Sequence, residues 1–159
     1  MRVRAIVAED FVNYRLPSLF IASAFCDWKC CTEQELPLET CQNSPLAASP
    51  IRTVDDKDIL KAFQSNDITK AVVIGGLEPF QQSAELVGLI ETFRSAGETC
   101  PFVIYTGYTP EEIKGVTDIL RPFGNIIVKY GRYRPGDAPH IDQVLGVPLV
   151  SNNQFAAEL

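Results

Sequence analysis

Four of the five cysteines in this 159-residue chain fall within one short stretch, at Cys26, Cys30, Cys31 and Cys41. They follow the apolar run 19–22, which is typical of a strand. Thiolates are ligands of iron–sulfur clusters and of structural zinc, and both kinds of site draw three or four sulfurs from a loop. The segment 26–50 is therefore predicted to hold a metal site.

The spacing of these cysteines bears on which metal they bind. Cys26, Cys30 and Cys41 supply three ligands, whereas Cys31 adjoins Cys30, and neighbouring residues rarely point at the same metal. Zinc ligands usually come in C-x2-C pairs, and the stretch contains none. Three thiolates would leave one iron of a 4Fe–4S cluster open to a substrate. A zinc-stabilised interaction module and a cluster that only carries electrons remain the alternatives.

The composition restricts the class of protein. Apolar residues make up 46% of the chain and charged residues 21%, and the formal net charge is −6. This balance predicts one globular domain over 1–159, and the negative charge argues against nucleic acid as a partner. No apolar run is long enough to cross a membrane, and residues 1–10 lack the apolar core of a signal peptide. We therefore expect a cytoplasmic protein with no membrane partner.

Beyond the cysteine stretch the pattern predicts strands that alternate with helices. Strands are expected at 2–8, 18–25, 71–74, 101–105, 125–129 and 147–150, and helices at 55–63, 82–96 and 109–122. Continuous apolar runs are typical of strands buried on both faces, as in a parallel sheet. We expect an α/β fold, an open, partial (β/α) barrel with a mostly parallel sheet. Ligands in such folds collect at the carboxyl ends of the strands, where the cysteine stretch also lies.

Two further motifs follow predicted strands. Gly75-Gly76-Leu77-Glu78-Pro79 comes after the run 71–74, and its glycines would let a ligand approach the backbone. Glu78 would then lie at the rim and accept from an ammonium group, although an ordinary strand–helix turn explains the same residues. Thr106 follows the next strand and precedes Thr109-Pro110-Glu111-Glu112. That tetrapeptide predicts a helix start, with a hydroxyl cap and proline at the first helical position.

Three single residues outside these motifs also bear on the site or the core. Trp28 lies inside the cysteine stretch, where its ring could shield a cluster, stack on an adenine or simply anchor the loop in the core. His140 is the only histidine, and we expect it to be a solvated loop residue. Cys100 precedes a predicted strand, and we expect a structural role for it.

Taken in order, these motifs resemble those of the radical S-adenosylmethionine superfamily. Within it they are closest to the glycyl-radical-activating group, which includes the activating protein of anaerobic ribonucleotide reductase. The resemblance runs over most of the chain. It rests on residues 10–13 (a D-x-V-N lead-in), 19–30 (a strand leading into C-x3-C), 41–43, 75–79 (a GGEP motif with an inserted leucine), 105–112 and 151–154.

The resemblance implies a site and a chemistry. Three cysteines, here Cys26, Cys30 and Cys41, would bind a 4Fe–4S cluster whose fourth iron chelates S-adenosylmethionine. Gly75, Gly76 and Glu78 would form the methionine-binding segment. One electron from the cluster would then cleave the sulfonium and yield a 5′-deoxyadenosyl radical.

The resemblance also implies further contacts and partners. Trp28, Asn43 and Thr106 would contact the cofactor. The radical would abstract a hydrogen from a glycine of a partner, a glycyl radical enzyme such as anaerobic ribonucleotide reductase. An external electron donor such as flavodoxin would reduce the cluster.

The cysteine spacing departs from that of the family. The family pattern C-x3-C-x2-C would place its third cysteine at position 33, where Glu33 stands. Either the loop carries an insertion and Cys41 keeps the role, or Cys31 has taken it over. We prefer Cys41, because Asn43 follows it as an asparagine does in the family.

Overall fold

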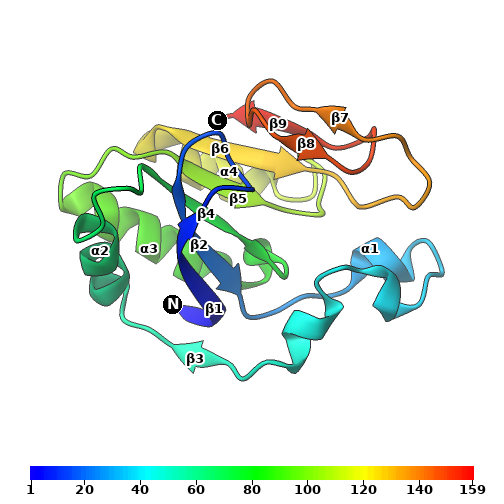
Figure 1. Ribbon diagram of the computed structural model, residues 1–159, viewed down its shortest axis with the longest axis horizontal. Helices are drawn as coiled ribbons and strands as arrows, with labels where there is room; N and C mark the ends of the chain where they lie inside the picture. The colour runs from blue at the N-terminus through cyan, green and yellow to red at the C-terminus, as the bar shows by residue number, and fades with distance from the viewer.

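A seven-stranded sheet forms the centre of the molecule, in the order β3-β1-β2-β4-β5-β6-β9 (Figure 1). The structure, a computed structural model, describes residues 1–159. The strands of the sheet are β1 (Arg2–Asp10), β2 (Ser18–Ser23), β3 (Arg52–Thr53), β4 (Ala71–Gly76), β5 (Phe102–Tyr105), β6 (Ile126–Tyr130) and β9 (Phe155–Glu158). A separate two-stranded ribbon pairs β7 (His140–Ile141) with β8 (Pro148–Leu149).

The four central strands run parallel, and the outer strands run against them. β2 pairs with β4, β4 with β5, and β5 with β6 in parallel, whereas β1 and β9 add to this block antiparallel. The α/β class is therefore confirmed, with a mixed sheet. The sheet is open, with β3 at one edge and β9 at the other, so a partial barrel is not confirmed.

The helices are α1 (Lys29–Thr32), α2 (Asp56–Gln64), α3 (Ser83–Ser95) and α4 (Lys114–Leu120). Short 3₁₀ turns accompany them: η1 (Leu38–Thr40), η2 (Ser44–Ala48), η3 (Pro79–Gln82) and η4 (Arg121–Phe123). No helix is long and apolar enough to cross a membrane.

Each face of the sheet has its own core, because successive residues of a strand point to opposite sides. On one face, Val72 and Ile74 pack with Phe93 of α3 in a cluster of 22 buried residues that also takes in α2 and α4. On the other, Val73 packs with Tyr14 of the β1–β2 loop and Leu149 of β8 in a cluster of eight. Strands buried on both sides explain the continuous apolar runs in the sequence.

The predicted helix start at Thr109 was wrong. Helix α4 begins at Lys114, its N-cap Ile113 has no side-chain cap, and residues 110–113 form turns. The carboxylate of Glu112 accepts from the Thr109 backbone N–H at 2.8 Å and binds Arg132 and Lys29 from other segments. Glu112 thus makes the local capping contact with Thr109 and, in addition, two tertiary ion pairs, while the regular helix begins two residues later.

Several short elements were not predicted, among them β3, β7 and β9. β9 carries the sequence Phe-Ala-Ala-Glu, which has no strand pattern, and it becomes a strand by pairing along β6 from Tyr130 to Ile127. Within the segment 26–50, predicted to lack regular structure, the short elements α1, η1 and η2 fold. Figure 1 shows this segment, hereafter the cysteine loop, extending away from the sheet before the chain returns to form β3.

Candidate metal centre

A cavity of about 560 Å³ lies where β2, β4, β5 and β6 reach their carboxyl ends. Its walls come from the cysteine loop on one side and, on the other, from the residues at or just beyond the ends of the strands. The volume lies in the range of small-molecule sites. The parallel alignment of the four strands gathers these chain segments, as the sequence predicted.

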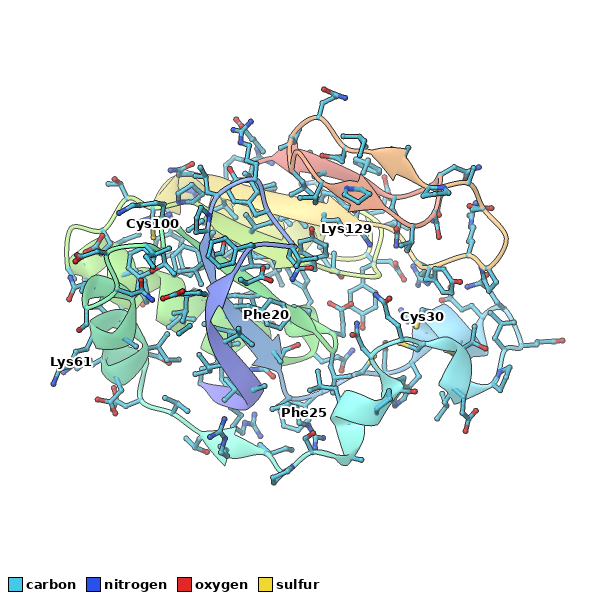
Figure 2. All side chains as sticks on the ribbon, viewed as in Figure 1. Phe20, Phe25, Cys30, Lys61, Cys100 and Lys129 are labelled. Carbon is cyan, nitrogen blue, oxygen red and sulfur yellow. The ribbon has the colours of Figure 1, made fainter.

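The structure brings the three predicted metal ligands to one cavity. Cys26, Cys30 and Cys41 all line it and are half-buried. Cys31 also lines it, but this residue is buried, and its sulfur lies 3.8 Å from the sulfur of Cys30. Cys100 lies apart from this cavity, on the other side of the molecule from Cys30 (Figure 2).

The thiols differ in how readily they ionise. Cys30 and Cys41 titrate as a pair: their interaction lowers the pKa of Cys41 and raises the pKa of Cys30, and the backbone N–H groups of Asn43 and Ser44 also favour the Cys41 thiolate. Burial raises the pKa of Cys26 to about 11. Because the thiolate is the form that binds iron, the proton held between Cys30 and Cys41 must leave when both bind a cluster.

The arrangement of donors is not that of a single-ion site. No three cysteine, histidine, aspartate or glutamate side chains gather closely enough to hold one metal ion. A structural zinc ion needs its ligands to meet at one point. The cysteines of an iron–sulfur cluster each bind a different iron, so they surround a larger group. Three half-buried thiols that line one cavity are compatible with a cluster.

Arginine and glycine residues anchor the two ends of the cysteine loop to the sheet. The guanidinium of Arg4 donates to the Ala24 carbonyl at 3.0 Å and to the Ser49 carbonyl. Gly76 has a φ of +77°, and a Cβ there would lie 2.8 Å from Leu46 in the loop. The left-handed φ strains any residue other than glycine, and the loop packs closely on this end of β4, which is a structural reason for Gly76 beside the predicted ligand contact.

Gly75, Gly76 and Glu78 line the cavity, but Glu78 lies deeper than predicted. It is 6% exposed rather than placed at the rim. Its carboxylate accepts from the hydroxyl of Thr106 at 2.8 Å and the N–H of Gly107 at 2.9 Å. Burial raises the pKa of Glu78. Glu78 therefore joins the end of β4 to the end of β5 and brings a carboxylate to the cavity wall.

Of the three other predicted cofactor contacts, two line the cavity and one does not. Asn43 and Thr106 line it. Trp28 is not among the lining residues; its backbone is left-handed, with φ of 63°, and its carbonyl accepts from the N–H groups of Cys31 and Thr32. Trp28 thus starts helix α1, and its contact with an adenine stays a prediction.

Lys129 is a cavity residue that was not predicted. It is the penultimate residue of the buried strand β6, is 6% exposed and lines the cavity. Its ammonium donates to the Gly131 carbonyl at 3.0 Å rather than to a carboxylate, and burial lowers its pKa to about 8. Figure 2 shows Lys129 near the end of its strand, on the side toward the cysteine loop. The signal in the sequence was a lysine closing an apolar strand, because lysine is almost never buried unless paired.

Cysteines grouped around a cavity at the carboxyl edge of a parallel sheet define a class, the iron–sulfur proteins. Comparison with protein families agrees, since the model of the family described as "4Fe-4S single cluster domain" matches residues 18–138. The match spans most of the chain, including the cysteine loop and all four parallel strands. The protein belongs to this family. Searches of curated proteins and of solved structures gave no match.

Proposed function

We propose that the protein binds its 4Fe–4S cluster through Cys26, Cys30 and Cys41 and uses it to cleave S-adenosylmethionine reductively. We further propose that the radical formed passes to a glycine of a partner, a glycyl radical enzyme such as anaerobic ribonucleotide reductase. An external donor of the flavodoxin type would supply the electron. The family membership supports the cluster, and the cavity beside the cysteines supports a substrate.

The observation that carries the proposal is a pair of opposite charges buried in the wall of this cavity. Lys129 presents an ammonium and Glu78 a carboxylate, each 6% exposed. An α-amino acid carries the complementary pair, one carboxylate and one ammonium. Buried charges are costly unless they are paired, so a ligand that pairs with Lys129 gains affinity. The methionine part of S-adenosylmethionine has this charge pattern.

The chemistry that a bound cluster supplies is the transfer of one electron to the sulfonium, which yields methionine and a 5′-deoxyadenosyl radical. The residues of the chain bind and orient. The ammonium of Lys129 would pair with the methionine carboxylate. The hydrogen bonds to Glu78 from Thr106 and Gly107 fix its carboxylate in place before a ligand arrives. Half-burial of the cysteines limits the access of water to the site.

A cluster that only carries electrons is the other candidate, and the family match is equally compatible with it. An electron carrier needs no substrate cavity and no buried lysine without a carboxylate partner. The cavity of about 560 Å³ and Lys129 therefore favour substrate cleavage.

The decisive experiment is anaerobic reconstitution followed by addition of S-adenosylmethionine and dithionite. We expect 5′-deoxyadenosine and methionine in equal amounts, measured by mass spectrometry. Lys129→Met should load the same amount of iron and bind S-adenosylmethionine about tenfold or more weakly, as expected for loss of a charge-assisted contact. If the protein with a full cluster yields no 5′-deoxyadenosine, the proposal of cleavage is contradicted and the electron-carrier function is favoured.

The ligand set is tested by single cysteine substitutions. Cys41→Ala should abolish the cluster, measured as iron and sulfide per chain and by the visible spectrum. Cys31→Ala should not. Cys100→Ala is the matched control, since Cys100 is a cysteine outside the cavity. Loss of the cluster in Cys31→Ala with retention in Cys41→Ala would assign the third ligand to Cys31 instead.

A further inference from the structure

Four charged side chains from three separate segments meet beside the cysteine loop. Arg132, just after β6, lies 2.6 Å from Glu33 of the cysteine loop and 2.7 Å from Glu112 of the β5–α4 turn. Lys29, at the start of α1, lies 3.0 Å from Glu112. We call the group Lys29, Glu33, Glu112 and Arg132 the clasp. It ties the cysteine loop to the segments that follow two of the parallel strands.

Arg132 is the centre of the clasp. Its side chain is only 13% exposed, and it binds both carboxylates and also the carbonyl of Gly107 at 3.2 Å. The hydrogen bonds from Arg132 lower the pKa of Glu112 well below its usual range, so this carboxylate stays charged. A guanidinium that binds two carboxylates in a fork holds them with defined geometry, which a single exposed pair does not.

The clasp holds the segment that contains Cys30, and this segment is not stable without tertiary contacts. Helix α1 has four residues and no side-chain cap, and a helix so short is not stable alone. Gln34, one residue after Glu33, donates to the carbonyl of Cys30 at 2.6 Å and to the carbonyl of Tyr133 at 2.8 Å. The position of Cys30 therefore depends on contacts with the 132–133 segment.

A second set of contacts in the same place involves an aromatic ring. The hydroxyl of Tyr108 donates to Asp27 at 2.6 Å, which fixes the residue next to Cys26. The cations of Lys29 and Arg132 lie 4.9 Å and 5.9 Å from the centre of the Tyr108 ring. Cations over an aromatic face are attracted to it, so the ring adds to the ion pairs.

We propose that Arg132 is a positioning residue for the cysteine loop: through Glu33 and Glu112 it holds helix α1 in the place from which Cys30 reaches the cavity. The proposal rests on Cys30 being a cluster ligand, but not on cleavage of S-adenosylmethionine.

Hydrogen exchange of the protein without a cluster tests the clasp directly. The amides of residues 31–34 are hydrogen-bonded within the α1 turn. In Arg132→Gln we expect them to exchange about tenfold faster, because a charge-assisted hydrogen-bond pair no longer opposes local opening. Amides of β4 should exchange as in the wild type. After anaerobic reconstitution the variant should hold less iron and sulfide per chain.

Three further variants complete the test. Glu112→Gln breaks the clasp from the other side and should give the same regional change, so the test does not depend on the folding of one variant. Arg132→Lys keeps the charge without the fork and should restore part of the protection and of the iron content. Lys114→Gln removes an exposed ion pair with Asp118 on α4 and should change neither.

Two outcomes would overturn the proposal. One is exchange of residues 31–34 in Arg132→Gln at the wild-type rate. The other is loss of iron without faster exchange, which would mean that Arg132 contacts the bound group instead of holding the loop. A wild-type protein that binds a cluster yet fails to cleave S-adenosylmethionine would leave the proposal intact.

Discussion

The helix-covered face of the sheet and the cysteine loop are held in place by different forces. On that face, α3 buries the side chains of Leu86, Ile90 and Phe93 fully against the sheet. Burial of apolar surface is a non-directional force, so it does not require particular atoms to meet at a fixed geometry. The cysteine loop contributes only one fully buried residue, Cys31. It is held by directed contacts such as the clasp, the Arg4 bonds and the packing of Leu46 on Gly76.

This difference suits a metal site on a rigid scaffold. Apolar packing makes the strand ends rigid, and those ends carry Glu78 and Lys129. Directed polar contacts can open locally at lower cost than a packed apolar core. Changes in the core should therefore alter global stability, whereas changes around the loop should alter local opening and cluster loading.

The largest effect on stability is expected in the apolar core. Phe93 is fully buried and lies with its ring 5.1 Å from that of Phe102 and 5.5 Å from that of Phe63. Phe93→Ala should lower the free energy of unfolding by about 3–5 kcal/mol, because it removes this burial and leaves a cavity. Urea denaturation measures it. Phe11→Ala, at a residue 62% exposed, is the control and should cost at most about 0.5 kcal/mol.

A smaller change in the free energy of unfolding, an increase, is expected when Lys129 is replaced. Lys129→Met should raise the free energy of unfolding at pH 7 by about 2 kcal/mol, because the burial of this ammonium costs more than the attraction of Glu78 returns. The same variant should bind S-adenosylmethionine more weakly. A decrease in stability would show instead that the bond to the Gly131 carbonyl is the main role of Lys129.

The pH dependence of this effect has a definite sign. The pKa of Lys129 is about 8 in the folded protein and has its ordinary value of 10.5 when the chain unfolds. Between these values the unfolded state holds one more proton, so the stability of the wild type rises with pH. The advantage of Lys129→Met should therefore be full below pH 8 and shrink as the pH rises toward 10.5. Urea denaturation of both proteins from pH 7 to 10.5 measures this. A difference in the free energy of unfolding that stays constant over this range would show that Lys129 does not lose its proton near pH 8 in the folded protein.

The smallest effects on the free energy of unfolding are expected at Asp55 and Thr109, the capping residues of two helix starts that the sequence predicts. Asp55 caps α2, since its carboxylate accepts from the Lys57 N–H, and Asp55→Ala should cost about 1 kcal/mol. Thr109 caps no helix, because α4 starts at Lys114, so Thr109→Ala should cost less than about 0.5 kcal/mol. Equal costs in thermal or urea unfolding would mean that the 109–113 turn contributes as a helix start after all.

The sequence by itself determined the elements whose signals are local. The apolar runs at 71–74, 101–105 and 125–129 became β4, β5 and β6, and Asp55 began α2, because burial pattern and capping are read within a few residues. The cysteines and the strand-end motif 75–79 were also visible. Their meeting at one cavity followed from the parallel arrangement of the strands.

Only the tertiary structure decided the features that depend on distant partners. β9 is a strand because it pairs with β6, and Glu112 forms ion pairs with Arg132 and Lys29 from other segments. Glu78 and Lys129 lie buried in one wall because the ends of β4 and β6 flank the same cavity. The physical reason is that pairing, ion binding and burial each involve residues far apart in the chain, on which local sequence patterns carry no information.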